Sequence, residues 1–290
     1  MMHLQEFETY RPLLFSIAYR MLGTAMEAED IVQDTYLRYS QTEWESIKSH
    51  KYYLTTITTR LCINKMQSAQ SQRENYVGNW LPEPILTDNQ SLLENPSERM
   101  NTHDSISMAF LVLLESLSAS ERAVFILREV FDYKYGEIAQ IIEKSEDACR
   151  QLFSRAKTHL RNNRPRFEPD PKQHEMMLTN FLLAINAGDL DNLVTMLADD
   201  ALLIGDGGNK RGAATRPIHG NQNIATFFLG IRRFYDDLQL QPQIKVVNGF
   251  PAIILYQDET VYALVSLDIS DNKIKQIHLV SNDEKLQGLN

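Results

Sequence analysis

The spacing of apolar residues divides the first half of the chain into two helical parts and a linker. Through Leu160, apolar residues recur three and four positions apart, as at Leu14, Ile17 and Met21, and this period predicts α-helices. Between residues 76 and 96 the helical period is lost, and one glycine and three prolines interrupt the chain, which is typical of a linker. Helical spacing then resumes at residue 105.

A second boundary is predicted at residues 165–173, where Pro165 and Pro171 end the helical pattern. Beyond it, the helical patterns His174–Ala187 and Asn221–Tyr235 flank short runs rich in β-branched and aromatic residues. These runs predict strands at Ile244–Val247, Ala252–Tyr256, Val261–Ile269 and Ile274–Val280. Helices and antiparallel-looking strands within one segment predict a small α+β domain.

Composition narrows the class of protein. With 290 residues, 43% hydrophobic and 23% charged, the chain is expected to be globular with two or three domains. No stretch reaches the ~18 uninterrupted apolar residues of a membrane span, and the first residues lack the apolar run of a signal peptide, so we expect a cytoplasmic protein. Cys62 and Cys149 have no neighbours at metal-ligand spacing, which favours buried thiols. We therefore expect no metal and no cofactor.

The charge distribution is more informative than the net charge of −9. Residues 47–73 carry five basic and no acidic side chains, and residues 150–166 are again basic without an acid. Two basic faces on an acidic chain fit either two phosphate contacts or two solvated helix faces.

A helix-turn-helix is predicted between Lys134 and Leu160. A short turn at residues 143–145 ends with Ser145, a good N-cap. Cys149 then starts the apolar stripe of the second helix. The opposite face of that helix presents polar and basic side chains, namely Arg150, Gln151, Ser154, Arg155 and Lys157. Such a face suits the major groove of DNA, although an ordinary helical corner gives a similar stripe.

An acidic and amide face with an apolar edge is predicted in the segment 28–38. Its members fall three and four positions apart and are Asp30, Gln33, Asp34 and Leu37. This face suits a protein partner better than DNA, although most such faces are merely solvated.

The order of these features resembles that of an extracytoplasmic-function (ECF) RNA polymerase sigma factor. The acidic helix, the basic helix after it, the linker and the helix-turn-helix follow one another as in sigma regions 2 and 4. The resemblance covers about the first 165 residues and implies a cytoplasmic protein that binds core RNA polymerase and promoter DNA.

The resemblance also implies roles for particular residues. Asp30, Gln33, Asp34 and Leu37 would bind the clamp helices of the largest polymerase subunit. The minus-ten promoter element would be contacted by Lys51, Arg60, Asn64 and Lys65. Trp44, Tyr52 and Tyr53 are either further contributors there or core residues. The minus-thirty-five element would be contacted by Lys144, Arg150, Gln151, Ser154, Arg155 and Lys157.

The linker resembles a subgroup of these sigma factors that carries a C-terminal SnoaL-like domain. Residues 80–84 read Trp-Leu-Pro-Glu-Pro, and two prolines stiffen a segment whose Trp80 and Leu81 are apolar anchors. Residues 206–210 resemble an Asp-Gly-Gly-Gly-Lys signature with asparagine at the third glycine, and residues 248–252 and 282–286 resemble further family segments. The implied regulatory residues are Trp80, Leu81, Pro82, Asp206, Gly207, Gly208 and Lys210.

The fold expected from this resemblance is two all-α sigma domains followed by an α+β SnoaL-like cone, a curved antiparallel sheet with helices. The boundaries are 1–75 for region 2, 76–104 for the linker, 105–166 for region 4 and 174–290 for the SnoaL-like domain. We expect the last domain to control the sigma domains in cis through contacts with them or with the linker.

Two other functions compete with this interpretation. An ordinary helix-turn-helix regulator with a ligand-sensing domain would bind its operator without polymerase. An enzyme would use Asp206, His219 or His278 as acid or base, but Asp206 is expected in a turn and no carboxylate–histidine pair is evident, so we expect no catalysis. The promoter, the inducing signal, any cavity ligand, the sign of regulation and the oligomeric state stay open.

Overall fold

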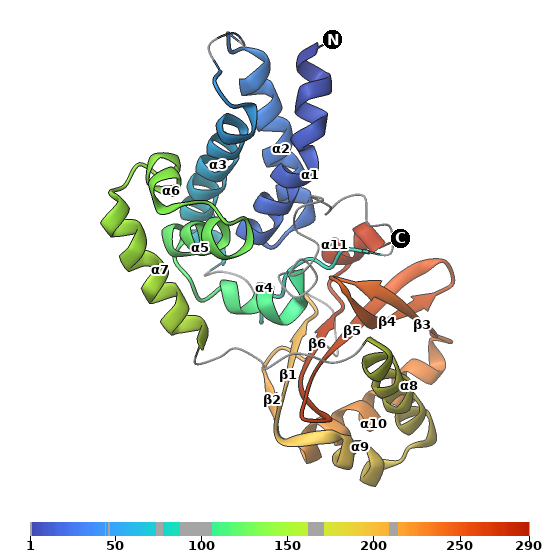
Figure 1. Ribbon diagram of the computed structural model, residues 1–290. Coiled ribbons are helices and arrows are strands. Elements are labelled where there is room, and N and C mark those ends of the chain that lie inside the picture. The colour runs from blue at the N-terminus through green and yellow to red at the C-terminus, as the bar shows by residue number, and fades with distance from the viewer. Residues whose placement is uncertain are drawn as a thin grey trace. The chain divides into compact units, whose positions relative to one another are not determined.

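The structure is a computed structural model that describes residues 2–43, 45, 47–73, 78–87, 106–161, 171–208 and 214–289 (Figure 1). The chain forms two compact units. The N-terminal unit comprises residues 1–74, 89–106 and 110–164, and the C-terminal unit comprises residues 75–88, 107–109 and 165–290. The two units are described separately below.

The N-terminal unit begins with a bundle of three helices, α1 (Met2–Leu22), α2 (Ala25–Ser40) and α3 (His50–Arg73). Its core is built from the apolar positions that recur three and four apart, because that spacing places them on one helical face. In α2 this face is fully or almost fully buried and consists of Ala28, Ile31, Val32, Thr35 and Tyr39. The Thr35 hydroxyl lies 3.1 Å from that of Thr58 and joins α2 to α3.

The remaining helices of this unit are short, namely α4 (Met108–Leu114), α5 (Ala119–Phe125), the π-helix η4 (Ile126–Val130), α6 (Tyr135–Ile141) and α7 (Glu146–Arg161). Ser118 and Glu121 form a capping box that starts α5. Arg122 is buried in α5 and donates hydrogen bonds to the Met21 carbonyl at 2.8 Å and to Glu115 at 2.7 Å. This buried guanidinium joins α5 to α1.

The C-terminal unit contains two long helices, one short helix and one sheet, followed by a short C-terminal helix (Figure 1). The helices are α8 (Pro171–Ala187), α9 (Leu190–Met196) and α10 (Asn221–Asp237). The strands are β1 (Leu197–Asp206), β2 (Ile218–His219), β3 (Gln241–Val247), β4 (Phe250–Gln257), β5 (Thr260–Ser270) and β6 (Lys273–Val280). The chain ends with α11 (Asp283–Leu286) and the 3₁₀ turn η5 (Gln287–Leu289).

The sheet has the strand order β2-β1-β6-β5-β4-β3 and is mixed. Strands β3 to β6 form an antiparallel meander, and β2 pairs antiparallel with β1. Strand β1 pairs parallel with β6, so the sheet is not purely antiparallel as the sequence suggested. The reason is that α10 and β3 to β5 intervene between β1 and β6, and a connection of this length permits the parallel direction.

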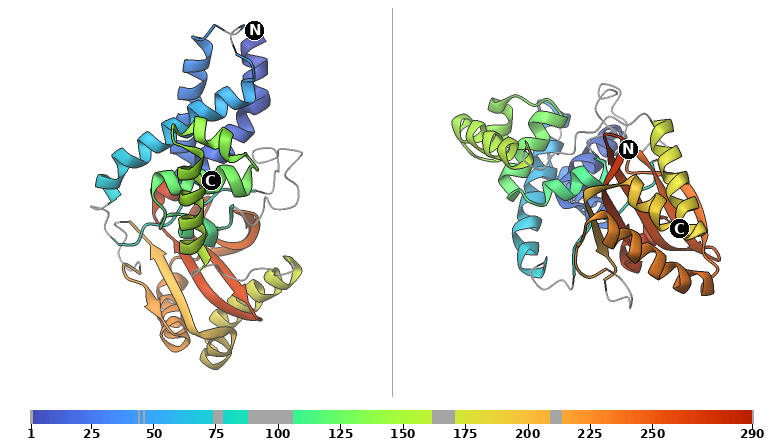
Figure 2. Two further views of the ribbon diagram at one scale, coloured as in Figure 1. Left: turned by 60° about the vertical axis from the view of Figure 1, so that its left-hand side comes forward. Right: turned by 90° about the horizontal axis from the view of Figure 1, so that it is seen from below.

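The two faces of the sheet have different characters because successive side chains of a strand point to opposite sides. Helices α8, α9 and α10 cover one face, as Figure 2 shows, and Val265 and Leu267 of β5 lie in this core. Phe181 and Phe228 meet there edge to face, with ring centroids 5.0 Å apart. The intervening side chains of β5, including Ser266 and Asp268, therefore point to the other face.

All four strands predicted after residue 240 are present, each one to three residues longer at one or both ends. Strand β1 and helix α9 were not predicted, because Asp199 and Asp200 interrupt the apolar run of β1. Asp206 is the last residue of β1, so the prediction of a turn at this position was wrong. No helix among the described residues is long and apolar enough to cross a membrane.

Candidate polymerase and promoter faces and the linker contact

The acidic face of α2 is fully accessible within the N-terminal unit. Asp30, Gln33, Asp34 and Leu37 are all exposed, and Leu37 retains 55% of its accessible surface. The opposite face of the same helix is buried against α1 and α3. Helix α2 is thus fixed on one side and presents two carboxylates, an amide and an apolar side chain on the other.

Helix α3 carries the residues predicted to contact the minus-ten element. Asn64 is exposed, whereas Lys65 pairs with Glu27 of α2 at 3.3 Å. Tyr53 donates or accepts a hydrogen bond with the Thr42 hydroxyl at 2.9 Å and thus belongs to the region 2 fold. Trp44 lies outside the described residues.

One face of α3 also contacts α6 and the loop before it. Arg60 donates to the carbonyls of Ile141 at 2.7 Å and Gln140 at 2.9 Å, and it forms an ion pair with Glu143 at 2.8 Å. A guanidinium at the C-terminal end of α6 satisfies carbonyls that have no partner within the helix and interacts favourably with the helix dipole.

The same face of α3 makes three further contacts with this region. The hydroxyls of Thr55 and Tyr133 lie 2.9 Å apart, and the Lys51 ammonium lies 5.9 Å from the Tyr133 ring centroid. Tyr52 donates to Gln140 of α6 at 3.2 Å. Two predicted minus-ten residues, Lys51 and Arg60, therefore face the helix-turn-helix in this arrangement.

The helix-turn-helix consists of α6 and α7, as the sequence predicts. Glu143 adopts a φ of 56° in the turn, and the Ser145 hydroxyl accepts from the Ala148 amide at 3.2 Å. Cys149 and Leu160 of α7 are buried. The predicted DNA-contacting side chains are all exposed and are Lys144, Arg150, Gln151, Ser154, Arg155 and Lys157.

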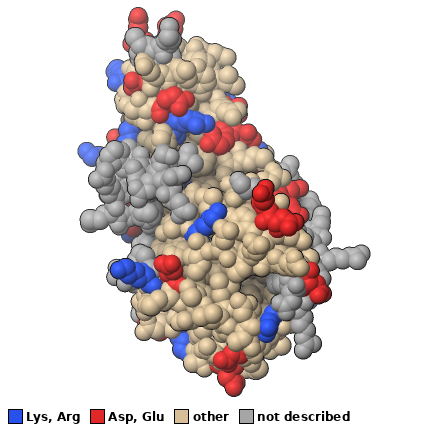
Figure 3. Space-filling view, turned by 90° about the vertical axis from the view of Figure 1, so that its right-hand side faces the viewer, with Lys and Arg blue, Asp and Glu red and all other residues tan. Residues whose placement is uncertain are grey.

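Two of these cations have partners on the surface of the unit. Arg150 pairs with Glu146 and lies 4.6 Å from the Tyr135 ring centroid, and Lys157 pairs with Glu129 at 3.4 Å. Exposed pairs of this kind contribute at most about 1 kcal/mol, so phosphate groups can replace them at little cost. On the face of the molecule that Figure 3 shows, the described acidic and basic side chains are scattered among uncharged residues.

The first half of the predicted linker packs in the C-terminal unit. The carboxylate of Asp206 is fully buried, forms an ion pair with Lys285 at 2.6 Å and accepts a hydrogen bond from the Leu81 amide at 2.8 Å. Lys285 also donates to the Leu81 carbonyl, and its ammonium lies 4.1 Å from the Trp80 ring centroid. Leu81 and Pro82 are buried. Asp206 and Lys285 thus hold the backbone of one linker residue from both sides.

The next linker residues pair with the end of β3. Ile85 and Asn248 exchange two hydrogen bonds of 2.9 and 3.2 Å, and the Thr87 amide donates to the Val246 carbonyl at 3.0 Å. The Gly249 amide donates to the Thr87 hydroxyl at 2.9 Å. The linker therefore adds a short bridge to the exposed edge of the sheet, which blunts that edge.

Gly208 follows Asp206 and has a structural reason to be glycine. Its φ is +53°, and a Cβ there would lie 3.0 Å from the side chain of Asn282. The Gly208 amide donates to Asp206 at 3.3 Å, and Gly207 is buried. Lys210 lies outside the described residues.

The three C-terminal family segments therefore meet at the linker, which sequence reasoning did not foresee. Lys285 and Asn248 were not among the predicted site residues, although both lie in those segments. The sequence did contain a signal, because the three segments follow one another as in the family that the chain resembles. A contact shared by all three segments is one reason for their joint presence.

The three acid–base candidates lie in different environments. Asp206 is paired with Lys285, and His219 is exposed. His278 is fully buried, with its Nδ1 3.7 Å from Asp268, a carboxylate–histidine pair that the sequence did not reveal. Among the described residues, no group of three His, Cys, Asp or Glu side chains could hold a metal ion.

The Sigma-70 region 2 family model matches residues 7–72, and the Sigma-70, region 4 model matches residues 107–160. These matches define the class, a sigma-70-type initiation factor. The chain is 32% identical to the ECF RNA polymerase sigma factor SigJ of Mycobacterium tuberculosis, over 99% of this chain and 94% of SigJ. The chain therefore belongs to the ECF RNA polymerase sigma factors.

Two further similarities extend over the C-terminal unit. The chain is 28% identical to the probable ECF RNA polymerase sigma factor SigI of M. tuberculosis, over 98% of this chain and 94% of SigI. The crystal structure of M. tuberculosis SigJ has a TM-score of 0.78 to this structure at 29% identity, over 98% of each chain. The function is promoter recognition and transcription initiation, and the alternative of an operator-binding regulator is not favoured.

Proposed function

We propose that the exposed α2 face, formed by Asp30, Gln33, Asp34 and Leu37, binds the clamp helices of the largest polymerase subunit. The observation that supports this docking surface is that all four side chains are exposed, whereas the opposite face of α2, from Ala28 to Tyr39, is buried. A carboxylate-rich face with one apolar side chain suits a basic helical partner, because charge steers the encounter and Leu37 adds apolar burial.

Charge reversal tests this docking surface. Asp34→Lys is expected to weaken binding to core polymerase by about 10-fold or more, since it places a cation against a basic partner. Glu8→Lys on α1 is the matched control, because Glu8 is also an exposed acid on a helix of this unit. Binding of fluorescent full-length protein to purified core polymerase measures both. Equal affinities of the two variants would rule out this face.

We further propose that α3 contacts the minus-ten element and α7 the minus-thirty-five element. Arg150, Gln151 and Ser154 lie on the exposed side of α7, within reach of base edges, while Lys144 and Lys157 are placed for phosphates. Gln151→Ala is expected to relax the base preference at one minus-thirty-five position. Lys144→Ala should weaken holoenzyme binding to all minus-thirty-five sequences alike and reduce the salt dependence of binding. Holoenzyme binding to a randomised minus-thirty-five library separates these outcomes.

We also propose that the C-terminal unit modulates the sigma domains in cis and has no catalytic role. Support comes from the linker contact, in which Asp206 accepts from the Leu81 amide and Lys285 donates to the Leu81 carbonyl. Leu81 belongs to the linker that joins regions 2 and 4 in the sequence. Covalent attachment gives such a contact a high effective concentration, so modest affinity is enough to bias it. The protein would act in the cytoplasm, where core polymerase is found.

Run-off transcription with purified core polymerase tests this regulation. The full-length chain, a chain truncated after Arg166 and the variant Lys285→Met are compared on one promoter. We expect the truncated chain and Lys285→Met to change initiation in the same direction, because both remove the linker contact. Lys275→Met is the control, since Lys275 pairs with Asp200 at an exposed position. Identical initiation by all four proteins would contradict regulation in cis.

A further inference from the structure

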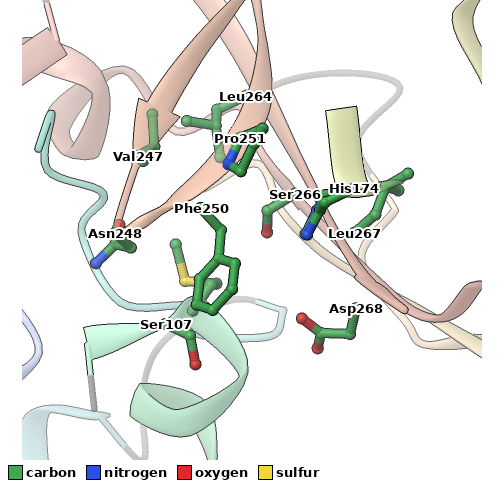
Figure 4. A pocket seen from close by; sticks show the side chains of 11 residues that line it. Ser107, His174, Val247, Asn248, Phe250, Pro251, Leu264, Ser266, Leu267 and Asp268 are labelled. Carbon is green, nitrogen blue, oxygen red and sulfur yellow. The ribbon is translucent and has the colours of Figure 1, made fainter. Parts of the chain in front are cut away.

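A cluster of buried polar side chains lies on the sheet face opposite α8, α9 and α10. Ser266 and Asp268 point there from β5, and His278 stands beside Ser266 on β6. His174 enters from the first turn of α8, with its ring 5.7 Å from that of Phe250. Figure 4 shows His174 beside Ser266, and the Asp268 carboxylate directed into the same small cavity.

These side chains are buried without hydrogen-bond partners. The unpartnered atoms among the described residues of this unit are both ring nitrogens of His174 and of His278, the Ser266 hydroxyl and one oxygen of Asp268. His174, Asp268 and His278 retain 1%, 5% and 0% of their accessible surface. A buried polar group without a partner destabilises the state that buries it, so this closed arrangement is costly.

The ionisation of the cluster is consistent with uncompensated burial. Burial lowers the pKa of His174 to about 4 and that of His278 to about 3. Burial also raises the pKa of Asp268 well above its usual value. The lining of the cavity includes no Lys or Arg, and on the same face Asp206 and Lys285 are paired with each other. Charged neighbours therefore do not offset the desolvation.

The cover of this cavity includes Ser107 and Met108. Met108 is the first residue of α4 and Ser107 precedes it. Residues 107–109 group with the C-terminal unit, while the rest of α4 groups with the N-terminal unit. We propose that residues 107–109 dock reversibly on the sheet of their own unit, because the polar cluster beneath them disfavours the closed state, and we call this contact the release point of residues 107–109.

Apolar replacement of the cluster tests the release point. In full-length protein at pH 7.5, we expect Ser266→Ala to slow amide hydrogen exchange in residues 107–109 and 172–175 about 5-fold. The combination of Ser266→Ala with His278→Leu should slow it by at least about 50-fold, because each change removes unsatisfied polar atoms. His219→Leu, at an exposed position of the same unit, should leave exchange unchanged.

The opposite result overturns the proposal. Unchanged or faster exchange in Ser266→Ala would mean that the hydroxyl has a bound water or solute as partner and stabilises the closed state. This variant is decisive even if the double variant fails to fold, since it removes one atom and no charge. The role of release in transcription rests on the proposed regulation in cis. Hydrogen exchange is measured without polymerase, so unchanged or faster exchange would leave the proposed regulation in cis intact. Equal run-off activities of the full-length and truncated chains would overturn that regulation and leave the reversible docking of residues 107–109 intact.

Discussion

The ion pair between Asp206 and Lys285 illustrates how single residues can join distant parts of this chain. Both side chains are almost completely buried; Asp206 accepts a hydrogen bond from the Leu81 amide, and Lys285 donates one to the Leu81 carbonyl. Burying two charges is costly, and the pair is favourable only because each charge has further partners. Its geometry therefore depends on the linker being in place.

Removing one partner should be much more harmful than removing an exposed ion pair. Lys285→Met is expected to lower the free energy of unfolding of the C-terminal unit by about 3–5 kcal/mol, because it leaves Asp206 buried and unpaired. Lys275→Met should change it by less than about 1 kcal/mol, since Lys275 and Asp200 are exposed. Urea denaturation of the full-length variants measures the difference. Similar losses in both variants would contradict this account of the pair.

His174 should make the C-terminal unit sensitive to acid. Its pKa is about 4 in the folded protein and 6.5 in the unfolded chain. Above pH 6.5 both states are neutral, and as the pH falls towards 4 only the unfolded state binds the proton. Between pH 7.5 and 5 wild type should therefore lose about 2 kcal/mol more unfolding free energy than His174→Gln. Denaturation at the two pH values tests this, with His219→Gln expected to behave as wild type.

Side-chain environment was only partly predictable from the sequence at this scale. The exposure of the α2 and α7 faces followed from helical spacing, which depends on residues close in the chain. The environment of Asp206 did not, because its partners Leu81 and Lys285 are 125 and 79 positions away. Local patterns carry no information about which distant charge will meet a buried carboxylate.

The contact between α3 and α6 is the most informative feature at the scale of elements. Arg60 contacts α6, and Lys51 contacts Tyr133 just before α6. Because both residues are proposed to contact the minus-ten element, the closed arrangement and minus-ten binding are expected to compete. Competition of this kind makes promoter affinity depend on the stability of the α3–α6 contact.

Tyr133→Phe separates this contact from DNA binding. It removes the hydroxyl that meets Thr55 and leaves the Thr55 hydroxyl buried without that partner, so the closed arrangement should lose about 1–3 kcal/mol. Holoenzyme affinity for promoter DNA is then expected to rise several-fold, as measured by fluorescence anisotropy. Tyr53→Phe, which loses a similar bond to Thr42 within region 2, should not raise it. Unchanged affinity in Tyr133→Phe would mean that the contact does not compete with DNA.

Elements were predictable where one local period dominated. Strands β4 to β6 contain many apolar, β-branched and aromatic residues, and α7 has a clear apolar stripe and an N-cap. Strand β1 was missed because Asp199 and Asp200 occupy its exposed positions, and its parallel pairing with β6 depends on tertiary contacts alone. The bridge between Leu86 and Val247 is similarly invisible to local patterns.

At the scale of the whole molecule, the chain crosses between its two units five times, because residues 75–88 and 107–109 also belong to the C-terminal unit. Region 2 comes first, residues 75–88 belong to the C-terminal unit, region 4 returns to the N-terminal unit, and residues 165–290 complete the C-terminal unit. The C-terminal unit is thus assembled around a segment from the middle of the sequence and is not a simple C-terminal extension.

Truncation after Arg166 should therefore affect residues far upstream. Leu81, Pro82 and Pro84 are buried in the full-length chain, and most of their cover comes from the part removed. We expect limited proteolysis to cut the truncated chain between residues 78 and 87 at least about 10-fold faster than the full-length chain. Cleavage between residues 106 and 161 serves as the internal control, because that segment keeps its own core. Equal protection of residues 78–87 would contradict the contact.

The separation of Leu81 from Lys285 by 204 residues also has a temporal consequence. A ribosome adding about 5–20 residues per second needs roughly 10–40 seconds to synthesise the stretch between them. By the end of this interval regions 2 and 4 have left the ribosome, while Lys285, which holds the linker, has only just been added. Every newly made copy therefore passes through a nascent stage in which its sigma domains are complete and the linker contact has not yet formed.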